Sequence, residues 1–537
     1  MIQMRETRSK TVAGVLGLLG LGLLVSAATG EAQASIEPAE FGENETALFS
    51  PALEWSLSYS DWSGNPFDIV ADVTFTHSDS GEQRKTQMFY DGGDTWKFRF
   101  TGTRTGQWAF TTESPHGPLD GLNGSVQVHA NPDPGARGFI RLQGQKFVRQ
   151  TGEGGTAGNK GQFSGGEVEG LISNIMKLNR ATWVGEEGVK RDGWTPVQDT
   201  VGTAEKREAV LDEVWRLGAQ GLHLLPQRDM HDVSGGVNNP NIENLRAIEA
   251  AIIEAHSRGM FIHLFMWGDE ARGWHSPDGL NSDSDRRLNR YIAARFGPLP
   301  GWTLSLGFDL FEWTDNGEVE QWAAHLKERL GWYHPVMARD QGSVSPGLDV
   351  MATDHRIDSD FYEETVEQFN IAEGKPIQYE RRFAYMRDGV WTMDNTRRAF
   401  WNFAMAGGAS SIWGYYPEGS SADGAEGAEY PNPEQLRTHR TFWEGRFLPD
   451  MVRANHLSGD DNTRVLRSGA DKLVFYREQA GSIEMDLSGM DDPQPAVAVD
   501  TTRDYQEIDL GPLRPENQTI SLPHNSDWAL AVGAFAD

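Results

Sequence analysis

The chain has 537 residues, 38% hydrophobic and 23% charged, which is enough for several buried cores. Its 48 basic and 78 acidic side chains give a net charge of −30, which argues against a nucleic-acid partner or an anionic membrane. Cysteine is absent, so disulfide scaffolds, thiol catalysis and cysteine-bound metals are excluded. The 18 tryptophans make carbohydrate a candidate partner, but composition alone does not decide this.

The first 34 residues have the pattern of an export signal. Arg5, Arg8 and Lys10 precede an apolar run from residue 12 to 28, and residues 32–34 (Ala-Gln-Ala) fit a signal-peptidase cleavage site. A membrane anchor is the alternative, because the run approaches the length of a short span. The cleavage pattern and four glycines within the run favour removal. We expect a secreted or periplasmic protein that begins near Ser35 and does not contact the membrane after cleavage.

Residues 36–135 show short strands of period two, separated by Gly, Asn, Asp and Pro turn signals. The candidate strands are Glu54–Tyr59, Asp68–Phe75, Gln87–Tyr90, Thr95–Phe100, Gln107–Thr112 and Ser125–Val128. Regular strand spacing without helices predicts a β-sandwich.

Four motifs in this region carry a resemblance to a known family. They are Asn65-Pro66-Phe67, residues 88–93 (MFYDGG), residues 96–100 (WKFRF) and Gly106-Gln107-Trp108. Together they resemble domain-of-unknown-function family 5060 over about 90 residues. In that family the sandwich precedes a glycosidase barrel in secreted bacterial enzymes, so the resemblance implies a barrel downstream.

Residues 140–447 alternate short apolar runs with longer helical stretches, which predicts a parallel sheet of βα units. The candidate strands are Lys146–Gln150, Gly221–Leu225, Met260–Trp267, Trp302–Leu306, Pro335–Ala338, Leu348–Ala352, Pro376–Tyr379 and Ser410–Trp413. The candidate helices are Ala204–Leu217, Ile242–Arg258, Arg286–Arg295, Glu318–Leu330, Phe361–Ile371 and Thr396–Ala406. Eight strands over this length predict a (β/α)₈ TIM barrel. The gap between the fifth and sixth strands is too short for a helix, and residues 152–202 would form a wall of the catalytic face.

Residues 450–537 return to short strands and predict a second β-sandwich. Those strands are Thr463–Arg467, Lys472–Arg477, Ile483–Leu487, Ala496–Asp500, Thr519–Leu522 and Trp528–Val532. Residues 485–489 (MDLSG), 500–502 (DTT) and Asp527-Trp528 resemble the C-terminal collagen-binding-type sandwich of apiosidase-like barrel glycosidases. The fold class is therefore a central barrel between N-terminal and C-terminal sandwiches.

Catalytic groups of such a barrel lie where strands end, and Glu380 follows the seventh predicted strand. A strand that opens with Lys375-Pro376 and ends in Tyr379-Glu380 resembles the nucleophile strand of many retaining barrel glycosidases. The alternative is a structural glutamate paired with Arg381 or Arg382.

The partner carboxylate is expected after the fourth strand. Related barrels read Leu-Gly-Asn-Glu or Leu-Gly-Glu-Glu there, whereas this chain reads Leu306-Gly307-Phe308-Asp309. Asp309 is one methylene shorter than glutamate, and Glu312 could serve if a tight helical turn follows. The structural alternatives are a helix N-cap for Asp309 and a helix-start charge for Glu312.

Two carboxylates at these positions suit glycoside hydrolysis, in which one protonates the leaving oxygen and the other attacks or activates water. Aromatic and polar side chains near strand ends would bind the sugar through flat faces and hydrogen bonds. The candidates are Arg228, Trp267, His355, Tyr379, Trp413 and Tyr415. His263 is interpreted as a satisfied core histidine.

The sequence thus predicts a retaining glycoside hydrolase of a plant or algal polysaccharide or oligosaccharide, and it does not define the linkage or the oligomeric state. No ligand spacing or phosphate loop predicts a metal or cofactor. The alternatives are a polysaccharide lyase, which would use His355, Arg356, Arg381 or Arg382 on a uronate, and a catalytically dead carbohydrate-binding barrel.

Overall fold

The computed structural model describes most of the chain after the predicted export signal. The described residues are 38–39, 41–50, 52–157, 161–172, 174–176, 183–184, 190–191, 197–232, 234, 237–267, 281–307, 310–339, 345–353, 361–380, 392–412 and 432–535. All of them belong to one unit, residues 34–537, and the predicted signal lies outside them. Within these ranges, no helix combines the length and the apolar character needed to cross a bilayer.

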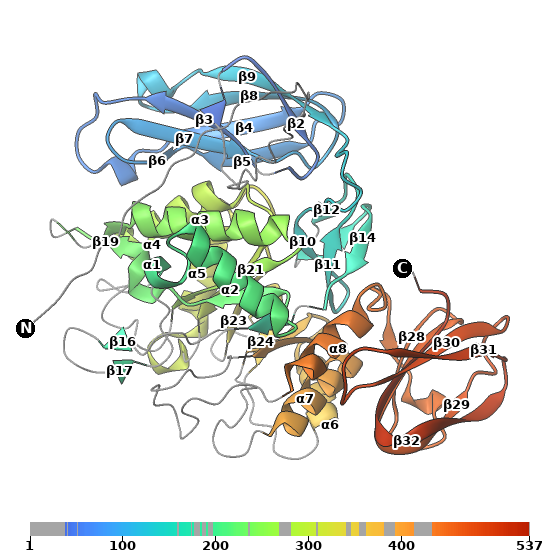
Figure 1. Cartoon of the computed structure of the whole chain (residues 1–537). Coiled ribbons are helices and arrows are strands. Elements are labelled where there is room, and N and C mark those ends of the chain that lie inside the picture. Colours follow the sequence, from blue (N-terminus) through green and yellow to red (C-terminus); the bar gives the residue numbers. More distant parts are fainter. Residues whose placement is uncertain are drawn as a thin grey trace, which may run out of the picture. The chain divides into compact units, whose positions relative to one another are not determined.

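Two stacked sheets form the N-terminal region (Figure 1). One sheet has the order β1 (Pro38–Ala39), β3 (Leu53–Ser58), β7 (Thr95–Phe100) and β6 (Phe89–Tyr90). The other has the order β2 (Glu43–Ala47), β9 (Asn123–His129), β8 (Gly106–Glu113), β4 (Asp72–His77) and β5 (Gln83–Gln87). Alternate side chains of the two sheets share one core, in which Trp55 stacks on Phe98 at 5.0 Å and meets Phe110 edge-on. This is the predicted sandwich.

Eight parallel strands close into a barrel in the central region. They are β15 (Ile175–Met176), β18 (Gly221–Leu224), β21 (Phe261–Trp267), β22 (Trp302–Gly307), β23 (Val336–Arg339), β24 (Val350–Thr353), β25 (Ile377–Tyr379) and β26 (Ala409–Ile412). Seven of them overlap the predicted strands. The helices between and after them are α1 (Val197–Thr200), α2 (Ala204–Arg216), α3 (Ile242–Ser257), α4 (Asp283–Phe296), α5 (Asn316–Lys327), α6 (Phe361–Ile371), α7 (Met393–Ala406) and α8 (Pro433–Trp443).

Local capping explains where several of these helices begin. The side chains of Thr203, Asn241, Ser282, Asp315 and Thr392 each accept a hydrogen bond from a backbone N–H in the first turn of α2, α3, α4, α5 and α7, respectively. Between β23 and β24 the described residues 345–349 contain no helix, as the short spacing predicted.

The prediction of the first barrel strand was wrong. Lys146–Gln150 is β11, which pairs antiparallel with β10 (Ile140–Gln143) and β14 (Val168–Gly170), whereas β15 pairs with β18 and β26 in the barrel. All five residues of β11 are buried, so the strand reads like a barrel strand although it lies outside. Residues 152–202 contain β14 of this separate sheet and the barrel strand β15 itself, so these two parts are not the predicted wall of the catalytic face.

One continuous six-stranded sheet replaces the two sheets expected of the C-terminal region. Its order is β27 (Val452–Arg453), β28 (Arg464–Ser468), β29 (Lys472–Asp486), β32 (Asn517–Val532), β30 (Gln494–Asp500) and β31 (Glu507–Leu513). The register between β29 and β32 shifts after Arg477, and Gln479 has a φ of 49°. Phe475 and Ile483, on either side of this bulge, share one core, so the sheet bends over itself.

A buried network of charged groups joins the N-terminal sandwich to the barrel helices. Arg99 of β7 donates to Glu54 at 2.7 Å and to Glu249 of α3 at 2.6 Å. Arg295 of α4 donates to the other Glu249 oxygen and to Asp91, each at 2.8 Å. Burial alone would raise the pKa of Glu249, but Arg295 and Arg99 lower it below its usual 4.5. Each buried charge in this network therefore has an opposite charge beside it.

We expect Glu249→Gln to lower the free energy of unfolding by about 3 kcal/mol at pH 7, because Arg99 and Arg295 each lose one of their two buried carboxylate partners. The pKa of Glu249 is depressed in the folded state, so this contribution is complete above about 4.5 and is lost as the pH falls through the folded value. Asp212→Asn is the matched control, because Asp212 pairs with Arg258 at 2.7 Å but is 66% exposed; it should change stability by less than about 0.5 kcal/mol. Denaturant unfolding measures both, and equal effects of the two variants would contradict the assignment.

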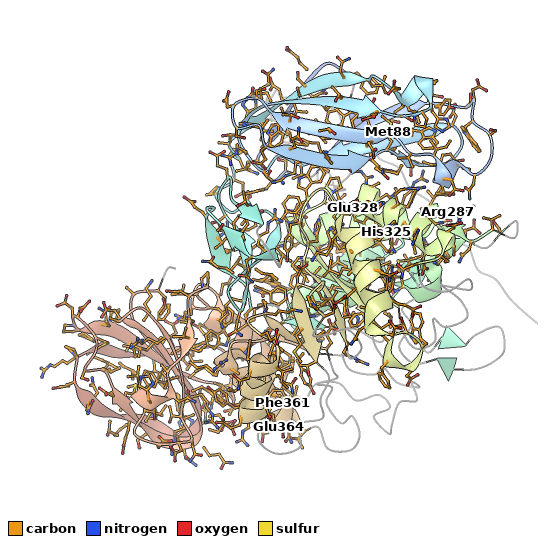
Figure 2. The ribbon with its side chains drawn as sticks, turned by 180° about the vertical axis from the view of Figure 1, so that it is seen from behind. Met88, Arg287, His325, Glu328, Phe361 and Glu364 are labelled. Carbon is orange, nitrogen blue, oxygen red and sulfur yellow. The ribbon has the colours of Figure 1, made fainter. Side chains whose placement is uncertain are left out.

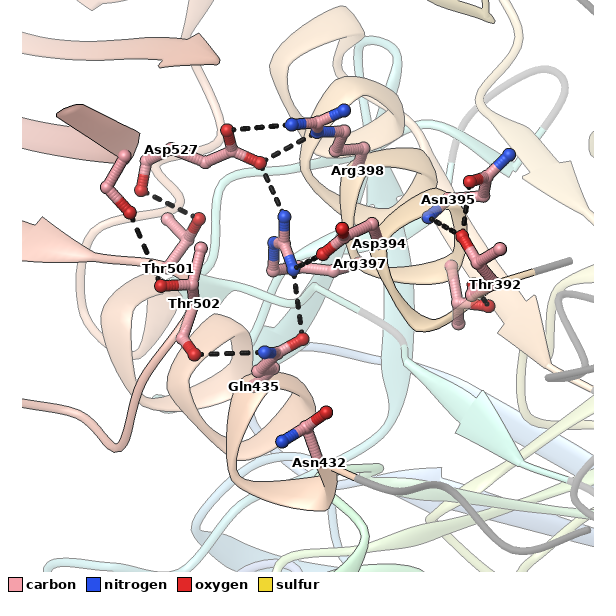
Figure 3. A network of polar contacts seen from close by, with 12 residues as sticks. Thr392, Asp394, Asn395, Arg397, Arg398, Asn432, Gln435, Thr501, Thr502 and Asp527 are labelled. Atoms are coloured by element: carbon pink, nitrogen blue, oxygen red, sulfur yellow. Dashed lines mark hydrogen bonds and ion pairs between the residues drawn. The ribbon is translucent and has the colours of Figure 1, made fainter. Parts of the chain in front are cut away.

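A second charged junction joins the barrel to the C-terminal sheet (Figure 3). Arg397 and Arg398 of α7 both donate to Asp527 of β32, at 2.5 and 2.7 Å. Gln435 of α8 accepts a hydrogen bond from Arg397 and donates to the carbonyl of Thr502. Burial alone would raise the pKa of Asp527, but the hydrogen bonds from Arg398 and Arg397 lower it below its usual value.

Lys146 is a buried amine in β11. Its ammonium lies 5.5 Å from the centre of the Phe447 ring, and among the described residues no carboxylate pairs with it. Burial, and secondarily the nearby Arg453, lower its pKa from 10.5 to about 7.

Lys146→Met should therefore raise the melting temperature by about 2 °C or more at pH 6. Below pH 7 the folded wild-type protein holds a buried cation, and its stability carries the full cost of that charge. Between pH 7 and 10.5 the folded lysine is neutral, so the cost is that of removing its proton, which falls as the pH rises. The advantage of the variant should shrink from pH 6 to pH 9, whereas Lys206→Met, at an exposed site, should show no such trend. Calorimetry at both pH values tests this, and a pH-independent difference would refute it.

Candidate functional site

The interior of the barrel changes from apolar to polar along its axis. At the amino ends of the strands, Ile175, Phe261, Met337 and Val350 form one apolar cluster. The hairpin of β10 and β11 adds Ile140, Leu142 and Phe147 to this cluster. Toward the carboxyl ends, the inward positions are His263, Thr303, Ser305, Gln378 and Glu380. One end of the barrel is thus packed with hydrocarbon, and the polar chemistry is at the other.

Glu380 is the centre of the polar end. It directly follows β25 and its side chain is fully buried. One carboxylate oxygen lies 3.0 Å from His263 Nε2 and accepts from Gln378 Nε2 at 3.1 Å. The other oxygen accepts from the Ser305 hydroxyl at 3.2 Å. The carboxylate is thus fixed from three strands.

The same contacts define the orientation of His263. Its Nδ1 lies 2.8 Å from the Thr303 hydroxyl, and its Nε2 faces Glu380. The carboxylate of Glu380 can only accept hydrogen bonds, so His263 Nε2 carries the proton. Nδ1 is then an acceptor, to which the Thr303 hydroxyl can donate. The ring of His223 lies 5.6 Å from that of His263 and extends the polar layer to β18. His263 is a satisfied interior histidine, as interpreted, but its partner is the candidate catalytic carboxylate.

Main-chain contacts hold the segment of Glu380 in place. Its N–H donates to the carbonyl of Thr353 at 2.9 Å, which continues the ladder between β24 and β25 by one residue. Its carbonyl accepts from Arg339 of β23 at 3.2 Å. Glu380 is therefore positioned by backbone and side chain together.

The predicted acid/base residues lie beyond β22. Glu312 ends the short 3₁₀ helix η7 (Leu310–Glu312) and is exposed, so the tight turn expected after this strand is present. Asp309 lies outside the described residues. The N-cap of α5 is Asp315, six residues after Asp309.

Tyr379 does not lie where predicted. Its buried ring packs 5.6 Å from Phe361 of α6 and 5.6 Å from Phe403 of α7, in the layer between sheet and helices. Successive strand residues point to opposite faces, so an inward Glu380 requires an outward Tyr379. The sequence contained this signal, because the two residues are adjacent.

Three contributors to the site were missed from sequence. Thr303, Ser305 and Gln378 are polar residues at alternate positions of strands that are otherwise apolar, which is the pattern of an inward polar face. The backbones of Arg228, in the 3₁₀ helix η4 (Gln227–Met230), and of Trp267, the last residue of β21, are described, but their side chains are not. His355, Trp413 and Tyr415 lie outside the described residues. In the described part of the chain, no group of three acidic, histidine or cysteine side chains could hold a metal ion.

Comparisons with known proteins agree with this architecture. Residues 51–115 match the domain of unknown function DUF5060. A "putative glycoside hydrolase" from Bacteroides vulgatus ATCC 8482 superimposes with a TM-score of 0.64 at 14% identity, over 91% of this chain and 99% of its own. The chain therefore shares the fold of that structure.

Two further solved structures support the same fold. A family 5 glycoside hydrolase from the same Bacteroides vulgatus strain gives a TM-score of 0.55 at 12% identity, over 74% of this chain and 92% of its own. Another structure, named glycoside hydrolase, gives 0.53 at 13% identity, over 75% of this chain and 98% of its own. No curated protein matches the sequence.

Proposed function

We propose that this protein is an exported, retaining glycoside hydrolase that acts on a plant or algal polysaccharide or its oligosaccharides. The observation that carries the proposal is the buried carboxylate of Glu380, held by His263, Ser305 and Gln378 at the carboxyl end of a barrel strand. The glycoside hydrolase fold of the structural relatives supports it.

In this proposal, Glu380 attacks the anomeric carbon and forms a covalent glycosyl ester. Glu312 or Asp309 donates a proton to the leaving oxygen, and the same residue then removes a proton from the water that hydrolyses the ester. Among the described residues, one oxygen of Glu380 faces two partners and the other faces one, the Ser305 hydroxyl. The less engaged oxygen is the one that attacks, because it loses fewer hydrogen bonds as its negative charge is transferred to the new bond.

The remaining side chains have supporting roles in this proposal. Trp267, Trp413 and Tyr415 offer aromatic faces to the sugar ring, and Arg228 and His355 offer donors to its hydroxyls. Tyr379 supports Glu380 from behind the sheet, through its packing on Phe361 and Phe403.

The first test is Glu380→Gln, assayed by reducing-end release from a panel of polysaccharides. We expect a loss of about three orders of magnitude or more in kcat/KM with the fold retained, because the amide cannot act as a nucleophile. Asp349→Asn is the matched control, since Asp349 is equally buried but lies before β24, at the amino end of the barrel. Far- and near-ultraviolet circular dichroism checks both folds.

Three outcomes would contradict the proposal. Full activity of Glu380→Gln excludes this residue as the nucleophile. Products that absorb ultraviolet light as unsaturated uronates indicate a lyase. Binding of the polymer without any release, by the wild-type chain, indicates a carbohydrate-binding barrel.

The second test separates the two acid/base candidates. Glu312→Gln and Asp309→Asn are compared on a natural oligosaccharide and on an aryl glycoside whose leaving group needs no proton. The acid/base variant should lose about 10²-fold or more on the oligosaccharide and far less on the activated aryl glycoside. Equal losses on both substrates, in both variants, would exclude both residues.

A further inference from the structure

A basic cleft lies outside the barrel interior, between the N-terminal sandwich and helices α4 and α5. Its volume is about 460 Å³, within the range of small-ligand sites. Four arginines line it, three from α4 and one from just after α5. They are Arg286, Arg287, Arg290 and Arg329. Figure 2 shows Arg287 and His325 of this cleft, on helices below the sandwich that carries Met88.

The charge of the cleft is opposite to that of the chain. The protein carries a net charge of −30, whereas the cleft combines four guanidinium groups with only two lining carboxylates, Asp68 and Asp283. Asp68 is occupied, because Arg287 binds both its oxygens, at 2.7 and 3.1 Å. The other arginines therefore meet little compensating charge within the cleft.

The arginines lie close enough to repel one another. Burial is the largest cause of the lowered pKa of Arg290; the repulsion of Arg287 and Arg329 lowers this pKa further, whereas the attraction of Asp68 raises it. His325, between the two helices, also has a lowered pKa, chiefly from burial and then from Arg329 and Arg286. A bound anion would relieve this repulsion, because each guanidinium would gain a charge-assisted partner.

Several donors of the cleft are not used within the protein. Arg286 is exposed, and no hydrogen bond or ion pair joins its guanidinium to another described residue. His325 Nε2 is buried without a partner in the same part of the chain. Arg290 donates a hydrogen bond to the carbonyl of Phe67, and Arg329 donates to Glu328 and to the carbonyl of His325. These two arginines therefore use part of their hydrogen-bonding capacity within the protein. Arg286 and His325 are thus available to a ligand, and so are further nitrogens of Arg329, because both of its hydrogen bonds come from Nη1.

The neutral and acidic lining residues favour a polyhydroxylated ligand over a bare inorganic anion. Gln87, Asp283 and Val70 complete the wall beside the arginines. An amide and a carboxylate bind hydroxyl groups, whereas a carboxylate would only repel a small anion. None of the described lining residues is Phe, Tyr or Trp, so recognition would depend on charge and hydrogen bonds rather than on stacking.

We propose that this cleft binds an acidic sugar unit, through the oxyanion of a uronate carboxylate or a sulfate ester. The arginines hold the oxyanion, and Gln87 and Asp283 hold ring hydroxyls. The site is separate from Glu380, so it serves as a second attachment point for an acidic glycan and does not depend on the catalytic assignment.

Isothermal titration with trigalacturonate, a sulfated galactan trisaccharide, a neutral trisaccharide and sodium sulfate tests this proposal. We expect one acidic trisaccharide to bind at least tenfold more tightly than the neutral one and than sulfate, and the tighter acidic arm identifies the oxyanion. Arg286→Gln and Arg329→Gln should each weaken that binding about tenfold or more. Arg258→Gln, a surface arginine of α3's C-terminal end paired with Asp212, should leave it unchanged.

Each contrary outcome overturns the proposal. No binding of either acidic trisaccharide, or binding that both cleft variants retain, excludes an acidic-sugar site here. Sulfate that binds as tightly as the saccharides reduces the cleft to a general anion site. Reducing-end release from a neutral substrate should be unchanged in Arg286→Gln, so failure of this proposal is distinguishable from failure of the hydrolase assignment.

Discussion

The burial of one carboxylate among parallel strands is the constraint on which the site depends. A charged group without water must have donors, and Glu380 finds them on strands β21, β22 and β25. Those donors must all point inward, and the parallel register places two of them on one face: His263 pairs with Thr303, and Ser305, two residues after Thr303, points to the same side. The apolar packing at the amino ends, with Phe147 of the β10–β11 hairpin, closes the opposite end of the barrel. Polar chemistry is therefore confined to one end.

The two junctions beside the barrel follow the same rule with the charges exchanged. There, buried arginines need a counter-charge, and carboxylates from another region supply it. Glu249 pairs with Arg99 across one junction, and Asp527 pairs with Arg397 across the other. Leaving a buried charge unpaired is costly, so each buried arginine requires the carboxylate of the other region to be in place. Trp332, between α5 and β23, adds an apolar anchor, since it lies in the core of the N-terminal sandwich and donates to the carbonyl of Thr101.

Sequence periodicity predicted what depends on neighbouring residues. It located seven barrel strands, the N-terminal sandwich and most helices, because alternation and helical spacing are local properties. It misplaced Lys146–Gln150, since a fully buried strand has the same pattern inside or outside a barrel. It also divided β29 into two strands, because the bulge around Gln479 interrupts the alternation although the sheet continues.

The candidate site was predictable only in part, for a related reason. The position of Glu380 followed from the end of a strand, but its partners His263 and Ser305 are 117 and 75 residues away in sequence. Charge pairs between Arg99 and Glu249 span 150 residues and leave no local pattern. Periodicity does predict which side of the strand each residue faces. Because Glu380 points into the barrel, Gln378 must also point inward and Tyr379 outward, and the structure shows both orientations.

The uneven distribution of charge has a consequence for how an acidic ligand could approach. A net charge of −30 repels anions at long range, so the field of the whole protein slows their encounter with it. Attraction at the cleft acts only at contact distance, where the exposed Arg286 and the half-buried Arg290 meet the oxyanion. Salt screens the long-range repulsion as well as the local attraction, so moderate ionic strength should speed association even as it weakens the bound state. Such a balance favours an acidic sugar carried on a long chain, because other units of the chain can hold it near the surface while the local contact forms.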